Sequence, residues 1–210
     1  MPWEDRPRLG LGPAIVGTAE LFVRRPREGF ARARRQGELM DPLLWLALVS
    51  FVGAVLQVGW GLLVGLPLER IVRGSQGDVA WLAVGAAGGA IQVVMRPIIA
   101  VAMAFVVAAI FHGCLALFGA LELSRLGFEG SLRAVAYAST AQLALVVPVA
   151  GGLIALLWNL VLVAIGLEIV HDTTFGRALA AVLVPFLACC LCGLLAGVGL
   201  GAAIAGLVAS

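Results

Sequence analysis

The residues of this chain best suited to chemistry are two histidines and the acidic side chains near one of them. In the run Glu168-Ile169-Val170-His171, the acid and the histidine have a spacing that places two possible metal ligands on one face of a helix. A di-iron helical bundle requires a second such pair and further inward glutamates, and the sequence has no second pair. His112 and Cys114 lie inside a long apolar run, where a single histidine typically packs through a hydrogen bond. We therefore expect no metal, no cofactor and no enzymatic activity.

A polar cluster is expected around the loop that follows Glu168. Glu168 and His171 are about one helical turn apart at the end of an apolar run, and Arg177 opens the next run after a short loop. The three side chains can then meet where the membrane ends. We predict that Glu168, His171 and Arg177 form a polar cap with salt bridges at the cytoplasmic surface.

The composition indicates which elements must position these residues. Hydrophobic residues make up 62% of the 210 residues and charged residues 12%, whereas soluble proteins carry about 25% charged residues. The mean hydropathy is +1.08. These values predict an integral membrane protein in contact with the lipid bilayer. The net charge of +2 is too small to indicate nucleic acid as a partner.

Arginines are concentrated before the first long apolar run. Most of the basic residues precede Asp41, and all of those are arginine. We predict that residues 1–42 form a short arginine-rich cytoplasmic leader with an amphipathic helix. The basic segment can contact anionic lipid head groups, at about 1 kcal/mol for each charge, or it can act only as a topology anchor. Its arginines are Arg24, Arg25, Arg27, Arg32, Arg34 and Arg35.

Apolar runs long enough to cross a bilayer organise the rest of the chain. The first, residues 43–66, carries no charge and would be about 36 Å long as a helix, against a bilayer core of about 30 Å. Because Arg96-Pro97 interrupts the second run, we expect that span to begin at Pro97, with residues 79–95 as an interfacial or tilted extension. A charge is costly at the centre of a bilayer, so we expect Arg96 near a membrane surface. Residues 43–210 are therefore predicted to be an all-α, polytopic transmembrane bundle with five spans, at about 43–66, 97–118, 132–147, 153–170 and 178–209.

The distribution of arginines predicts how these spans are oriented. Most arginines fall on the side of the N-terminus, so the positive-inside rule places the N-terminus in the cytoplasm and the C-terminus outside. The chain contains no lysine, which indicates a GC-rich bacterial genome. We expect a multi-pass protein of a bacterial inner membrane.

Small residues recur every four positions in the last apolar run. Gly193, Gly197 and Gly201 form the pattern that allows two helix backbones to approach closely. The partner helix can belong to the same bundle, or to a second copy of the chain, in which case the glycines form a homodimer seam.

Several short strings of the sequence, in this order and spacing, resemble the bacterial members of the Yip domain family of Ypt/Rab-interacting membrane proteins. That resemblance implies a five-span membrane fold, in agreement with the apolar runs. Eukaryotic members act in vesicle traffic between the endoplasmic reticulum and the Golgi by binding Rab GTPases. A bacterial chain would have no Rab partner, so the resemblance does not carry that role over. The strings include residues 24–30 (Arg-Arg-Pro-Arg-Glu-Gly-Phe), 41–44, 133–139, 148–152 and 166–171.

Two functions are compatible with these patterns. The first is a non-enzymatic scaffold that organises the membrane or binds a membrane-protein partner. The alternative is a small transporter or channel, which would need the polar side chains within the spans to converge on a cavity at the middle of the membrane. A scaffold needs the same side chains only to bridge helices. They are Gln57, Tyr137, Gln142 and Asn159.

Overall fold

The computed structural model describes residues 1–33, 38–65, 79–121 and 126–209, and within these it describes only the backbone of residues 65, 79–86 and 199–209. Every regular element in this part of the chain is a helix, as predicted.

The leader folds into three short helices. α1 (Arg6–Leu9) ends at Gly10, whose positive φ of 82° turns the chain before α2 (Leu11–Arg24) begins. α2 is amphipathic, because Ala14, Thr18 and Phe22 recur every four residues and are buried. α3 (Pro26–Arg32) begins with a proline, which suits the first helical turn because an N–H there has no partner within the helix. Arg34 and Arg35 lie outside the described residues.

Among the described residues, four helices are long and apolar enough to cross a membrane. They correspond to the first, second, fourth and fifth predicted spans. The helix of the first span continues as a π-helical segment, η1 (Gly61–Gly65). The four helices are α4 (Met40–Trp60), α6 (Val79–Leu117), α8 (Gly151–Val170) and α9 (Phe175–Ala209).

The third predicted span is divided between two helix types. α7 (Gly127–Ala138) continues directly into a 3₁₀ helix, η2 (Ser139–Val146), and together they would measure about 34 Å along the axis. The hydroxyls of Ser139 and Thr140 donate to the carbonyls of Ala136 and Tyr137, three residues earlier, and such local bonds favour the tighter 3₁₀ winding. Five spans therefore remain a prediction, whereas four are long single helices.

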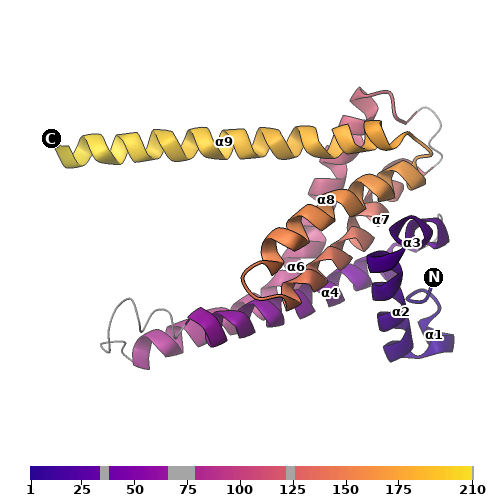
Figure 1. Cartoon of the computed structure of the whole chain (residues 1–210), viewed down its shortest axis with the longest axis horizontal. Helices are drawn as coiled ribbons and strands as arrows, with labels where there is room; N and C mark the ends of the chain where they lie inside the picture. Colours follow the sequence, from indigo (N-terminus) through magenta and orange to yellow (C-terminus); the bar gives the residue numbers. More distant parts are fainter. Residues whose placement is uncertain (34–37, 66–78, 122–125, 210) are drawn as a thin grey trace.

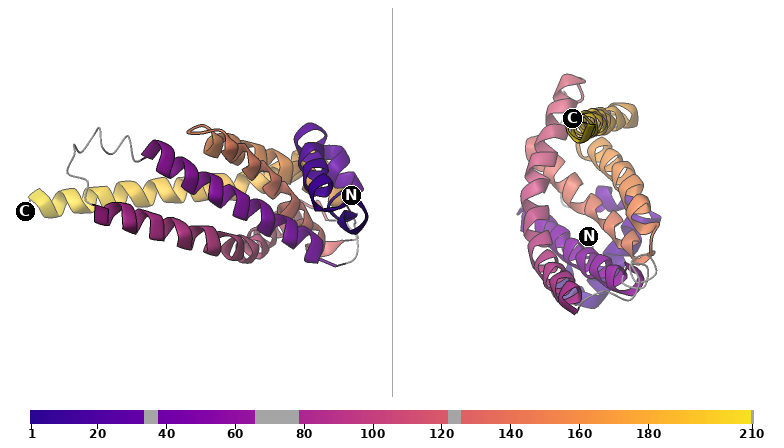
Figure 2. Two further views of the ribbon diagram at one scale, coloured as in Figure 1. Left: turned by 90° about the horizontal axis from the view of Figure 1, so that it is seen from below. Right: turned by 90° about the vertical axis from the view of Figure 1, so that its left-hand side faces the viewer.

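The second span starts much earlier than Pro97. α6 is one helix of 39 residues, and Pro97 lies inside it. Of the two possibilities left for residues 79–95, an interfacial segment or a tilted extension, the structure shows a helix that continues through Pro97. The loss of one hydrogen bond at a proline is tolerated in a helix that packs against neighbouring helices. Residues 79–95 continue the helix, and α6 curves along one side of the molecule (Figure 2).

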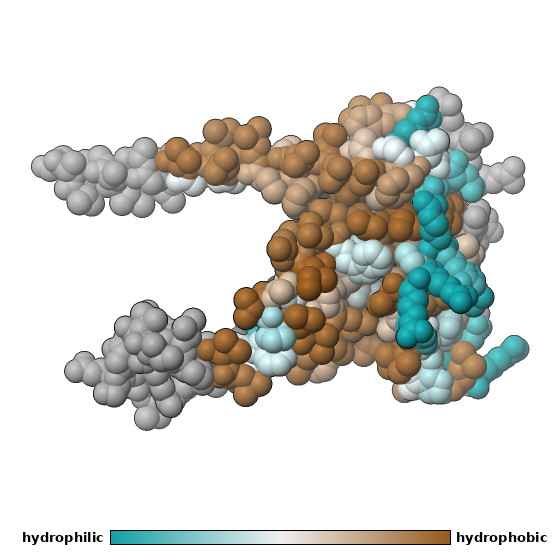
Figure 3. All heavy atoms as spheres, in the orientation of Figure 1, coloured by the Kyte–Doolittle hydropathy of each residue, from teal (hydrophilic) through white to brown (hydrophobic). Residues whose placement is uncertain are grey.

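The long helices form a bundle that opens toward one end. α4 packs along α6, while α7, η2 and α8 form a hairpin between them and α9 (Figure 1). The distal part of α9 extends beyond that hairpin. Hydrophilic side chains gather over the other end, where the leader lies, whereas the extending helices are apolar (Figure 3). We call the end that holds the leader the polar end.

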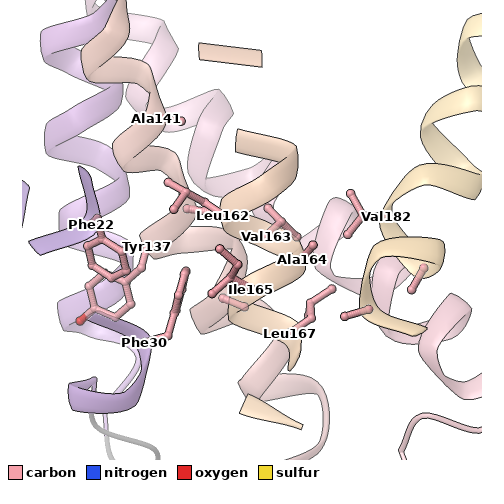
Figure 4. Packing of buried hydrophobic residues seen from close by; sticks show 14 of the residues in the cluster. Phe22, Phe30, Tyr137, Ala141, Leu162, Val163, Ala164, Ile165, Leu167 and Val182 are labelled. Carbon is pink, nitrogen blue, oxygen red and sulfur yellow. The ribbon is translucent and has the colours of Figure 1, made fainter. Parts of the chain in front are cut away.

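The main core joins the leader to the bundle. Phe22 and Phe30 of the leader point toward Tyr137 of α7, and the apolar side chains of α8 continue from there toward Val182 of α9 (Figure 4). Leu162 and the three aromatic side chains are at most 2% exposed. The leader is therefore part of the packed structure.

Candidate interaction surface and intramembrane cavity

Residues 1–33 form a folded cap on the polar end of the bundle. Trp3 is buried against Trp45 of α4, with ring centroids 5.3 Å apart, and its indole N–H donates to the carbonyl of Asp41 at 2.7 Å. Arg6 forms a salt bridge of 2.6 Å with the Asp41 carboxylate and lies over the Trp3 ring. These contacts fix the first turn of α4 to the cap.

An aromatic stack fixes the cap to the middle of the bundle. Phe22 packs edge to face against Phe30, at 4.9 Å between centroids, and parallel to Tyr137, at 5.6 Å. The Tyr137 hydroxyl donates to Glu4 at 2.9 Å, so a cap side chain satisfies the one polar atom of this buried ring. A Cβ at Gly166 would lie 2.8 Å from the Phe30 ring, and this close approach requires glycine.

The cap turns its arginines outward. The side chains of Arg24, Arg25, Arg27 and Arg32 are 58–75% exposed, and we call these four residues the arginine face. Arg24 pairs with Glu20 at 3.1 Å, while Arg25 and Arg32 share Glu28. Arg27 pairs with Glu168 of α8, so four cations face three carboxylates and the surface keeps a net charge of +1. It borders a groove of about 240 Å³ between α2 and α3.

The predicted cluster of Glu168, His171 and Arg177 does not form as expected, because each side chain has a different partner. Glu168 binds Arg27 of the cap at 2.9 Å. His171 turns into the bundle toward Ser131, at 2.8 Å, and Arg177 donates to the carbonyl of Gly119 at 3.2 Å. All three lie at the polar end of the bundle, but their bonds run to different elements: Glu168 to the cap, His171 to α7 and Arg177 to the turn after α6.

A buried hydroxyl links the two histidines that the sequence singled out. Ser131 of α7 lies 3.0 Å from His112 Nδ1 and 2.8 Å from His171 Nε2. A Cβ at Gly130 would lie 3.2 Å from the His171 ring, so a glycine allows this approach. Burial, with a further contribution from His112, lowers the pKa of His171 to about 4, although Asp172 opposes the shift. Ser131 carried no sequence signal, because its role depends on the meeting of three helices.

No group of three metal-binding side chains comes together in the described part of the chain. The Glu168 and His171 pair diverges, and the histidines face a serine hydroxyl. Of the cysteines, Cys114 is partly buried in α6, and the other three are exposed on α9.

Gly193 and Gly197 of the last span have no close neighbour among the described residues. A Cβ built at Gly193 or Gly197 would meet no atom within 4 Å. Both positions are exposed. The expected packing within the bundle is therefore not seen at these two glycines, and the other interpretation, contact with a second copy, stays a prediction. Gly201 lies in the part of α9 described by its backbone.

Three of the four polar residues proposed to converge within the membrane do so. Gln57, Gln142 and Asn159 line one cavity of about 400 Å³ between α4, α6, η2 and α8, and Arg96 joins them. Arg96 donates to the Gln57 side chain. Tyr137, the fourth residue, instead points toward the cap and binds Glu4. Arg96 was expected near a membrane surface and was not among the residues predicted to line this cavity.

Comparison with protein families gives one match. The family model described as the Yip1 domain matches residues 19–197. That range includes α3, the four long helices as far as Gly197, and all four residues of the arginine face. Comparisons with curated proteins and with solved structures gave no match.

Proposed function

The chain belongs to the Yip1 domain family, and on that premise we propose that it is a non-enzymatic membrane scaffold whose arginine face binds anionic lipid head groups at the cytoplasmic surface. The observation that carries this proposal is the folded cap. A basic tail that only set topology would not need Trp3, Phe22 and Phe30 to be buried in the bundle. Because these side chains are fixed, the arginines are held at one place on the surface.

Charge and position support a head-group ligand. The arginine face is basic and lies at the end of the long apolar helices, where a membrane surface would be. Each cation near an anionic membrane surface contributes about 1 kcal/mol, and the attraction falls within a Debye length. Arg27 is also tied to Glu168, so binding at the cap can be transmitted to the end of α8.

The test compares lipid binding by charge variants in mild detergent. We expect the triple change Arg24→Gln, Arg25→Gln and Arg32→Gln to weaken phosphatidylglycerol binding by about tenfold or more and to remove most of its salt dependence. The matched triple change to Lys keeps the charge and should bind like the wild type. Phosphatidylcholine controls for binding without net charge. Equal affinity and equal salt dependence for the wild type and the Gln variant would contradict the proposal.

We propose further that the polar end lies in the cytoplasm of a bacterial cell and that α7 and η2 together span the membrane. In a background without the native cysteines, single cysteines at Glu129 and Thr173 should be labelled from the cytoplasmic side. A cysteine at Val149, which is 94% exposed in the turn between η2 and α8, should be labelled from the opposite side. Labelling of all three from one side would overturn both statements.

A second candidate function, a small transporter or channel, is favoured by the cavity that Gln57, Gln142 and Asn159 line with Arg96. A cation in such a cavity would favour small anions. Vesicles that contain the protein should then release chloride or phosphate faster than empty vesicles, and Arg96→Gln should abolish the difference. Equal release from both kinds of vesicle would exclude this function.

A further inference from the structure

Arg96 is a charged residue inside a membrane-spanning helix, and its partner is neutral. It lies within the candidate span Ala87–Leu117. Its guanidinium donates to the Gln57 side chain, and no carboxylate of the described residues forms an ion pair with it. A guanidinium in a membrane is costly unless it is paired or reaches the head groups. Among the described residues, Arg96 is therefore a cation without an anionic partner.

The depth of Arg96 indicates which anion can reach it. Arg96 and Leu117, at the polar end of α6, are separated by about 32 Å of helix, against a bilayer core of about 30 Å. Trp60 is at a similar distance from Met40 along α4, and its indole N–H donates to the Leu145 carbonyl at 3.0 Å. Tryptophans concentrate at membrane interfaces. Arg96 consequently lies in the half of the membrane opposite the cap, here the far leaflet, and its long side chain can reach toward the lipid phosphates there.

Polar groups surround the space beside Arg96. Two adjoining cavities, of about 360 and 400 Å³, share Arg96, Ala100 and Gln142 in their lining. Gln142 donates to the Ser50 hydroxyl at 3.2 Å, and its carbonyl oxygen is buried without a hydrogen bond from the described residues. Asn159 adds a second carboxamide to the larger cavity. The site thus offers a cation and hydrogen-bonding amides together.

An apolar surface leads away from this site toward the middle of the membrane. Ile99, Met103 and Val106 follow Arg96 at spacings of three, four and three residues, which places them along one side of α6. Their side chains are 48–57% exposed, and we call them the apolar strip. Ile99 and Met103 also line the cavities, so the strip and the polar site are continuous.

We propose that this cavity binds one phospholipid of the far leaflet. Its phosphate lies on Arg96, its head group lies near the amides of Gln142 and Asn159, and one acyl chain runs along the apolar strip. The amide oxygens favour a head group that can donate a hydrogen bond, such as glycerol or ethanolamine. The quaternary ammonium of choline has no hydrogen to donate. The strip selects a lipid phosphodiester over inorganic phosphate, although both would suit Arg96.

The experiment measures the phospholipid that remains with the protein purified in mild detergent, by extraction and mass spectrometry. Wild-type protein should retain about one phosphatidylglycerol or phosphatidylethanolamine per chain and exchange it poorly for phosphatidylcholine. Arg96→Gln should lower the affinity by about tenfold or more, because it removes a charge-assisted hydrogen bond. Arg96→Lys keeps the charge and should retain most of the lipid. This binding should resist salt and be unchanged by the Gln variant of the arginine face, which separates it from binding at the cap.

A bulky substitution on the apolar strip provides a second test, which leaves Arg96 unchanged. Met103→Trp should displace the lipid, whereas Val94→Trp should not, because Val94 lies on the opposite side of α6 and is 61% exposed. Retention of lipid by both tryptophan variants, or by Arg96→Gln, would overturn the proposal. Displacement of the bound phospholipid by millimolar inorganic phosphate would also overturn the proposal, because the site would then bind the free anion and not a lipid.

Discussion

α8 and α9 are consecutive helices of similar apolar composition, but their surroundings differ. Of the apolar stretch with which α8 could cross a membrane, 44% is buried inside the protein, whereas the corresponding share of α9 is 17%. Gly166 of α8 lies against the Phe30 ring, while Gly193 and Gly197 of α9 face open space. Hydropathy indicates which helices can be inserted into a membrane. Lipid and protein interiors are equally apolar, so hydropathy cannot distinguish a helix surface that faces lipid from one that faces protein. It does not indicate which helices pack against each other. Four variants test whether this difference controls stability.

The largest effect is expected where the cap contacts the well-packed region. Phe22→Ala removes a fully buried ring that touches Phe30 and Tyr137, and it should lower the free energy of unfolding by about 3–5 kcal/mol. Denaturation with sodium dodecyl sulfate, followed by tryptophan fluorescence, measures the change. Val23→Ala, at a site that is 53% exposed, should cost less than about 0.5 kcal/mol. Similar values for the two variants would mean that the cap does not contribute to stability.

A second variant tests the α8 contact directly. Gly166→Leu forces a side chain into the space of the Phe30 ring and should destabilise the protein by about 3 kcal/mol. Gly152→Leu is the control on the same helix, because a side chain there meets no atom within 4 Å. If the control were equally destabilising, helix propensity or detergent contact would explain the loss, and the close approach to Phe30 would not.

The pH dependence of stability tests the buried polar contact at the end of α8. The pKa of His171 is about 4 in the folded protein, below the ordinary value of about 6.5. Between these values the unfolded chain binds the proton and the folded chain does not. The stability that this provides is complete above pH 6.5 and is lost as the pH falls toward 4, by about 2 kcal/mol at pH 5. Denaturation at pH 7 and pH 5 should show this loss, and His171→Gln should reduce it. An unchanged pH dependence in that variant would assign the loss to other groups.

The smallest effect is expected on α9. Gly197→Leu places a side chain in open space and should change the stability of the isolated chain by less than about 0.5 kcal/mol, as should Val198→Leu. Light scattering in detergent should be measured at the same time. A large loss of stability at Gly197 alone, together with loss of a dimer, would show that the glycines contact a second copy. The contrast between α8 and α9 would then apply only to the single chain.

The sequence predicted local properties well and contacts poorly. Apolar length was sufficient to find the helices from Leu43 onward, because crossing a bilayer depends on length and composition. The strings around Phe30 and Gly166 indicated the family. The contact between these two residues, however, depends on how the cap folds back. The spacing of Gly193 and Gly197 indicated a small-residue face on α9 but left open whether the partner helix belongs to the same bundle or to a second copy, since a repeat fixes one helix face and not its neighbour.

For the candidate sites, too, the sequence predicted where residues lie along the spans but not which residues they contact. The sequence placed Arg27 and Glu168 on one side of the membrane, but their salt bridge joins residues 141 positions apart. Ser131 had no signal, because a serine becomes important only when His112 and His171 approach it from other helices. Arg96 was expected at a membrane surface, where a long side chain can reach polar groups. The amides around it come from α4, η2 and α8, and the sequence could not show that they meet at Arg96.

The contact between Arg27 and Glu168 also sets an order of assembly. Ribosomes make the cap first, and the 141 residues from Arg27 to Glu168 then require about 7–28 s at 5–20 residues per second. Until Tyr137 and Gly166 have been synthesised, Phe22 and Phe30 have no native surface to cover them. The cap therefore leaves the ribosome before α8 but cannot reach its final position until α8 is in place, and its docking reports that α8 has been inserted.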